Sequence, residues 1–113
     1  MRIHEDHNGL YVNAISNLAD GKEVEGHLYQ VSTPSGFNGM LHFQTGPAAE
    51  VGVNGLTNEA LLAVLAHRLN VMNKKMPCRE NAIAITNIEQ AQLWLEKRTR
   101  DRLARGVEGT KEP

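Results

Sequence analysis

The spacing of apolar positions changes near residue 56, and this change divides the chain into two parts. Up to about residue 56, short apolar stretches alternate with turns, and this part holds eight of the ten glycines and two of the four prolines. The pattern predicts short β-strands at residues 10–15, 27–31 and 40–44. Glycine at position 21 and the Pro-Ser-Gly run at 34–36 mark turns between these strands.

Beyond residue 56, apolar side chains recur at three- and four-residue steps, which is typical of helices that bury one face. A first helix is predicted at about 58–73, with Thr57 as its N-cap. A second is predicted at about 79–105, after Pro77 and before a stop at Gly106. The second helix would be about 40 Å long and would extend beyond the first. We therefore expect its C-terminal part to contact another subunit.

The two patterns of apolar positions together predict an α+β fold in a single domain of residues 1–113. A small N-terminal antiparallel β-sheet (1–56) is followed by a C-terminal antiparallel helical hairpin (57–106) and a tail (107–113).

Composition narrows the classes of function. The chain has 113 residues, five of them aromatic, so one small domain with a modest core is expected, completed by oligomer formation. A formal net charge of −1 argues against a general nucleic-acid binder. A single cysteine and no signal-peptide pattern predict a cytosolic protein. No apolar run approaches the roughly 18 residues that a membrane span requires.

Charge is nevertheless concentrated near the end of the second helix, where residues 96–105 hold five basic and two acidic side chains. Arg98, Arg102 and Arg105 follow i, i+4, i+7 spacing and should line one face. Arg102 has no acid three or four residues away, and unpaired guanidinium groups suit phosphate because the planar fork bonds two oxygens. Basic residues here also complement the helix dipole, and the pattern by itself favours that simpler interpretation.

Two further stretches are candidates for ligand contacts. The glycine-rich connection at residues 46–55 can offer backbone amides to an anion, although an ordinary turn with positive φ at Asn54 and Gly55 is favoured. Cys78 is interpreted as a helix-cap residue, since no paired base is identifiable. Asn81, one turn into the second helix, can read a nucleobase edge or cap its own helix.

Catalytic and metal patterns are not evident. The run His4-Glu5-Asp6-His7 lies at the terminus without further matched ligands, and we expect it to face solvent. No Ser-His-Asp, paired-carboxylate or zinc pattern stands out. The sequence therefore predicts a binding protein with no catalytic residues, no metal and no cofactor.

Three segments resemble a known family: residues 42–69, residues 78–110 and, more weakly, residues 26–31. Together they resemble the phage anti-Thoeris family that carries the anti-CBASS/anti-Thoeris hairpin domain. The resemblance covers about residues 24–110, and the run from Arg98 to Thr110 is its most specific part.

The resemblance implies a phage-encoded immune-evasion sponge in the host bacterial cytoplasm. Such a protein binds cyclic nucleotide messengers without cleaving them, and so blocks Thoeris or CBASS signalling. The messengers are glycocyclic ADP-ribose and, in some members of the family, cyclic di- or trinucleotides bound at a separate site. The implied partners are these molecules and further copies of the chain, in dimers that can build hexamers; nucleic acid and membranes are not among them.

Site residues follow from the same resemblance, residue by residue. Arg98 and Arg102 match arginines that grip cyclic oligonucleotide phosphates. Asn81 and Met72 match the ADP-ribose-type pocket, where Met72 replaces an aromatic residue that stacks on adenine. A thioether can also pack on a purine. Supporting roles in the pocket are implied for Asn54, Gly55 and Thr110.

Three alternatives stay open. An enzyme that cleaves the cyclic nucleotide would need a general base, for which Glu80 and His42 are candidates. A small phage regulator would bind DNA through the basic helix, although the near-neutral net charge argues against it. A structural or assembly protein would bind no nucleotide.

Overall fold

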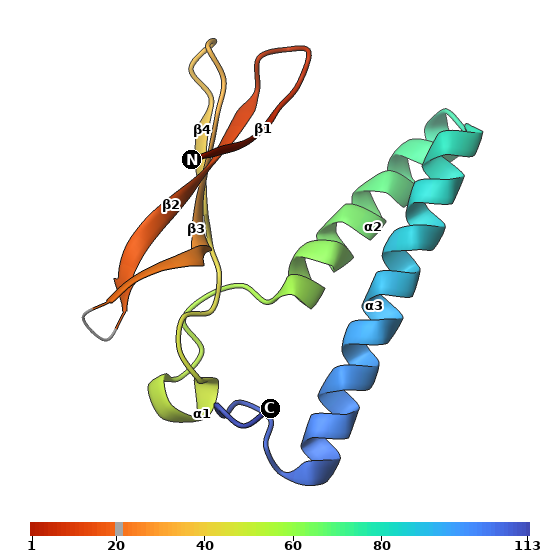
Figure 1. Cartoon of the computed structure of the whole chain (residues 1–113). Helices are drawn as coiled ribbons and strands as arrows, with labels where there is room; N and C mark the ends of the chain where they lie inside the picture. The colour runs from red at the N-terminus through yellow and green to blue at the C-terminus, as the bar shows by residue number, and fades with distance from the viewer. Residues whose placement is uncertain (20–21) are drawn as a thin grey trace. The chain divides into compact units, whose positions relative to one another are not determined.

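The computed structural model describes residues 1–19 and 22–113, and the side chains of residues 1–16 and 25–113. The chain divides into two compact units, Met1–Leu56 and Thr57–Pro113, which are treated separately below. The first unit carries a sheet and the second a pair of long helices, which confirms the predicted α+β fold (Figure 1). The turn predicted at position 21 lies outside the described residues.

The sheet of the first unit is an antiparallel meander in the order β1-β2-β3-β4. Its strands are β1 (Arg2–Glu5), β2 (Tyr11–Ala19), β3 (Lys22–Ser32) and β4 (Asn38–His42). The three predicted strands are present, and β2 and β3 are longer than predicted. β1 was missed because its sequence, Arg-Ile-His-Glu, holds a single apolar residue and gives no alternating pattern.

Apolar side chains of β2, β3 and β4 share one face of the sheet. Cross-strand pairs place Ala14 and Leu41 beside Tyr29, and Val12 beside Val31, on the same face. The Tyr29 ring meets the Phe43 ring edge-to-face, with centroids 5.7 Å apart. This arrangement is a favourable geometry for aromatic pairs, and it joins β3 to the segment that follows β4.

The connection after the sheet contains one short helix, α1 (Ala48–Val51), that the sequence did not predict. Phe43 and Leu56 form a parallel bridge, so the ends of the connection lie side by side. The first unit therefore ends in a closed loop.

The second unit is a helical hairpin of α2 (Asn58–Lys75) and α3 (Arg79–Arg105). The Thr57 hydroxyl accepts a hydrogen bond from the Ala60 amide at 3.1 Å, which confirms the predicted N-cap. The Cys78 thiol accepts from the Asn81 amide at 3.4 Å, so Cys78 is the expected cap residue of α3. Gly106 ends α3 with φ at 73°, as predicted for a left-handed stop.

Packing between the helices leaves much apolar surface exposed. Among the described residues the single buried hydrophobic side chain is Ile85 of α3. Because α3 has 27 residues and α2 has 18, the last turns of α3 extend past the start of α2 (Figure 1). Large apolar side chains remain exposed on both helices, including Val64, Leu65 and Val71 on α2 and Ile83, Leu93, Trp94 and Leu103 on α3. Within the described ranges, no helix is both long and apolar enough to cross a bilayer.

Candidate functional site

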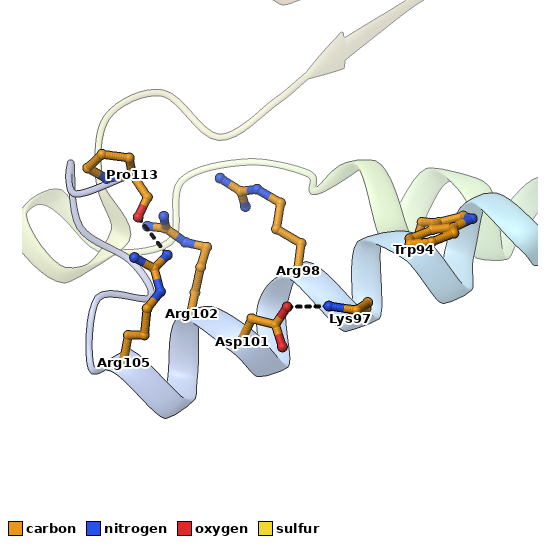
Figure 2. A pocket seen from close by; sticks show the side chains of 7 residues that line it. All are labelled: Trp94, Lys97, Arg98, Asp101, Arg102, Arg105 and Pro113. Atoms are coloured by element: carbon orange, nitrogen blue, oxygen red, sulfur yellow. Dashed lines mark hydrogen bonds and ion pairs between the residues drawn. The ribbon is translucent and has the colours of Figure 1, made fainter.

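A pocket of about 300 Å³ lies on the overhanging end of α3 (Figure 2). Its walls are the side chains of Trp94, Lys97, Arg98, Asp101, Arg102, Arg105 and Pro113. Helical spacing explains most of this set, because positions 94, 98, 101 and 105 recur on one face of an α-helix. The prediction that the three arginines line one surface is confirmed.

Positive charge dominates the pocket, which has four basic side chains and one acidic one. The Lys97 ammonium donates to the Asp101 carboxylate at 2.6 Å. This hydrogen bond lowers the pKa of Asp101 below its ordinary value of 3.8, and the charges of Lys97, Arg100 and Arg105 act in the same direction. Asp101 is therefore ionised at neutral pH and offsets one of the four positive charges.

Arg98 is the basic residue of the pocket whose side chain has no partner among the described residues. Its side chain is exposed, and within the described part of the chain it makes no hydrogen bond or ion pair. In Figure 2 its guanidinium projects from α3 with no interaction drawn to it. An unpaired guanidinium retains all five donors for an incoming anion.

Arg102 is in a different situation, because its side chain is 6% exposed and makes four hydrogen bonds. Its Nε donates to the Glu108 carboxylate at 3.2 Å, its Nη1 to the Glu112 carbonyl at 2.6 Å, and its Nη2 to the Val107 carbonyl at 2.8 Å and the Thr110 carbonyl at 3.2 Å. The prediction that Arg102 is unpaired is wrong. The acid lies six residues ahead, beyond the stop at Gly106, where helical spacing rules no longer apply.

The tail after α3 is folded around Arg102. The Thr110 hydroxyl donates to the Val107 carbonyl and accepts from the Glu112 amide at 3.2 Å. The Arg105 guanidinium donates to the Pro113 main-chain oxygen at 2.6 Å, which brings Pro113 to the pocket. In this structure Thr110 therefore shapes the tail, and the resemblance-based role in ligand binding stays a prediction.

Asn81 and Met72 lie near the other end of the hairpin. Met72 is one turn before the end of α2, and Asn81 is in the first turn of α3. Met72 is 44% exposed, and the Asn81 side chain makes no hydrogen bond within the described part of the chain. Along α3, Asn81 and Arg98 are about 26 Å apart at 1.5 Å per residue. One small messenger therefore cannot reach both residues in the same subunit.

Asn54 and Gly55 belong to the first unit, where both hold the connection together. The side-chain amide of Asn54 accepts a hydrogen bond from the Thr45 backbone amide at 2.9 Å and donates one to the Thr45 carbonyl at 2.8 Å. The backbone amide of Asn54 donates to Gln44 Oε1 at 2.9 Å. A Cβ on Gly55 would lie 2.6 Å from the Phe43 carbonyl carbon. The expectation of positive φ at Gly55 is wrong, and close approach of the backbone is what requires glycine there.

Sequence reasoning missed Trp94, Lys97, Asp101 and Pro113 as pocket residues. Trp94 is four residues before Arg98, Asp101 is three after it, and Lys97 is four before Asp101, so the helical spacing behind the arginine prediction could have found all three. Pro113 depends on the folded tail, for which the sequence carries no such signal. Elsewhere, Glu80 and His42 are exposed and do not line this pocket. The described residues contain no group of three or more metal-ligating side chains.

A short antiparallel sheet followed by a helical hairpin defines a small α+β hairpin-domain protein, and its hairpin carries a cationic pocket. The sequence profile of the Acb2/Tad1 hairpin domain matches residues 41–100, and the chain belongs to this family. Over 118 aligned positions it is 41% identical to a protein of Bacillus phage SBSphiJ7 named Thoeris anti-defense 1, covering 99% of this chain and 83% of that relative. The predicted family resemblance is thereby confirmed.

Proposed function

We propose that the protein is a phage anti-defence protein that acts against Thoeris by binding cyclic nucleotide messengers and keeping them from their receptors. The name of the Bacillus phage relative supports the anti-defence role. The observation that carries the binding mechanism is the unpaired Arg98 in a pocket where basic side chains outnumber acidic ones. A guanidinium in this setting is suited to a phosphate group.

Sequestration without cleavage is the mechanism that fits this pocket. A cleaving enzyme requires a general base whose pKa lies near the working pH. The one carboxylate of the pocket, Asp101, has a lowered pKa and is hydrogen-bonded to Lys97, so it is a weak proton acceptor. The ligand would therefore be held intact, and the free messenger concentration would fall by mass action.

Two classes of ligand are assigned to the two ends of the hairpin. Arg98 binds the phosphates of a cyclic di- or trinucleotide directly, while Arg102 contributes by holding the tail that completes the pocket. Asn81 and Met72 bind glycocyclic ADP-ribose near the turn between α2 and α3. Thr110 supports the Arg98 site through the tail that it stabilises. Asn54 and Gly55 stabilise the connection within the first unit, and the supporting role that the resemblance implies for them stays a prediction.

The protein acts as a homo-oligomer in the host bacterial cytoplasm under this proposal. Exposed apolar side chains outside the pocket support subunit association, among them Val64, Leu65 and Val71 of α2, because large apolar surface on a small unit is costly in water. Dimers formed through these helices, and hexamers built from the dimers, would bury it.

Equilibrium dialysis against a panel of messengers tests the proposal. The panel contains glycocyclic ADP-ribose, cyclic di-adenylate and cyclic tri-adenylate, with linear di-adenylate and duplex DNA as comparisons. Saturable retention of one or more cyclic messengers is expected. Retention of none of them would overturn the proposal, and salt-sensitive retention of duplex DNA alone would favour a DNA-binding regulator.

A further inference from the structure

Trp94 is the one tryptophan of the chain, and it is 70% exposed on α3. No aromatic or cation–π contact of its ring occurs among the described residues, although such contacts exist elsewhere, at Tyr29 and Tyr11. A large indole left in solvent is unusual, because its apolar surface is costly to hydrate. Trp94 nevertheless forms a wall of the cationic pocket, so its surface is presented to whatever enters.

The position of Trp94 relative to Arg98 fits the shape of a nucleotide. The two residues are four positions apart on α3, so they lie on the same face about 6 Å apart along the axis. Figure 2 shows the indole lying along α3, while the Arg98 side chain extends toward the tail. A nucleotide carries its base and its phosphate on two sides of one sugar. A phosphate held at Arg98 can therefore place its base over the indole.

Other pocket residues cannot supply this stacking surface. Arg102 is buried beneath the tail with its nitrogens bonded, and Lys97 is paired with Asp101. Arg105 donates to Pro113. An exposed aromatic ring beside an unpaired guanidinium is the combination by which proteins hold nucleotides without reading base identity.

We propose that Trp94 is the base-stacking residue of this pocket, so that the pocket selects phosphates that carry a nucleobase over phosphates that do not. The inference rests on the proposed function, which assigns cyclic oligonucleotides to the Arg98 end of the hairpin. Stacking on an aromatic side chain strengthens nucleotide binding by about 5- to 150-fold per base. Recognition then combines one charged contact with one flat apolar contact.

Intrinsic fluorescence gives a direct test, since all tryptophan emission comes from Trp94. Cyclic di-adenylate is titrated into the full chain while emission is recorded, and its affinity is measured in parallel by calorimetry. Emission should change with the same midpoint as binding. Trp94→Leu should weaken binding by about 5- to 150-fold, and Trp94→Phe should retain most of it. The matched control is Leu93→Ala, which alters an exposed neighbour outside the pocket.

Inorganic pyrophosphate serves as a probe that has phosphates and no base. Its weaker binding should depend on Arg98 and be the same in the wild-type protein and in Trp94→Leu. Equal affinity of the wild-type protein and Trp94→Leu for cyclic di-adenylate, with unchanged emission, would overturn the inference while leaving the proposed function standing. Trp94 emission that changes with protein concentration and not with added ligand would also overturn the inference, because it would place Trp94 in a contact between subunits. If cyclic di-adenylate does not bind the wild-type protein, the assignment of cyclic oligonucleotides fails and the inference fails with it.

Discussion

Arg98 and Arg102 have the same side chain but different roles, because their surroundings differ. They are one helical turn apart on α3, and both line the same pocket. Arg102 makes four hydrogen bonds to the tail, while Arg98 makes none within the described residues. A buried guanidinium with its donors satisfied stabilises structure, and an exposed one with free donors binds an anion.

Replacing Arg98 should separate the two classes of ligand. Arg98→Ala is expected to weaken cyclic di-adenylate binding by about 10- to 150-fold, the value of a lost charge-assisted hydrogen bond, with no change in Tm. Glycocyclic ADP-ribose binding should be unaffected by Arg98→Ala and lost in Asn81→Ala. Calorimetry measures both ligands.

The control for that experiment is Arg100→Ala, which removes the same charge from an exposed position outside the pocket. It should change the affinity for cyclic di-adenylate by less than about twofold, since an exposed charge that does not contact the ligand is screened by water and salt. Equal losses in Arg98→Ala and Arg100→Ala would mean that only net charge matters and would contradict a direct phosphate contact.

Replacing Arg102 should affect the fold of the tail. Arg102→Ala is expected to lower the free energy of unfolding by about 1.5–3 kcal/mol, because hydrogen bonds to a charged group are lost and Glu108 loses its partner. Hydrogen exchange should speed up at the backbone amides of Val107 and Thr110, because in the folded tail they donate hydrogen bonds to the carbonyls of Arg102 and Val107. Unchanged exchange at these two amides would show that Arg102 does not hold the tail.

At the scale of whole elements, the hairpin was predicted far better than the sheet. The bounds of α3 at Arg79–Arg105 agree with the prediction, because its ends are set by local chemistry at Cys78 and Gly106. β1 carries no alternation, and α1 is a single turn held by its loop, so neither has a local signal. Whether such elements form depends on tertiary contacts.

Part of the candidate site could likewise be predicted from the sequence, and part could not. The row of arginines on α3 could be predicted, since helical spacing alone places residues on a face. The pairing of Arg102 could not be predicted, because it depends on how residues 107–112 fold back after Gly106. Whether a side chain is free or engaged is a property of tertiary structure.

Asp101, the one acidic side chain of the pocket, should weaken the binding of an anionic ligand. Asp101→Asn should tighten binding of cyclic di-adenylate by about three- to tenfold at neutral pH, because it removes a repulsive charge and releases Lys97. Isothermal calorimetry of the wild-type protein and the variant, over a range of pH, measures the difference.

The pH dependence has a definite sign. The pKa of Asp101 is lowered in the folded chain, so its pairing with Lys97 stabilises the fold above the ordinary pKa of 3.8 and is lost as the pH falls through the lowered value. Between about pH 5 and pH 8 the carboxylate stays ionised, and the advantage of Asp101→Asn should be constant. An advantage that disappears within that range would contradict the assigned charge state.

At the scale of the whole molecule, exposed apolar residues predict self-association. Val64 and Val71 are both exposed and seven residues apart, so they share one face of α2. Light scattering at micromolar concentration should show a dimer or a larger assembly. The double substitution Val64→Glu, Val71→Glu should yield monomers with unchanged helix content. Val53→Glu, at an exposed loop position, is the control and should leave the assembly intact. A monomeric wild-type protein would contradict the proposed oligomer.

A protein that sequesters a messenger releases it intact when the protein unfolds, and this release can be measured. The full-length protein is mixed with each cyclic messenger, the free messenger is assayed, and the sample is then heat-denatured and assayed again by chromatography and mass spectrometry. Free messenger is expected to disappear on mixing and to return chemically unchanged after denaturation. Recovery of a cleaved or otherwise altered product would contradict sequestration and identify the protein as an enzyme.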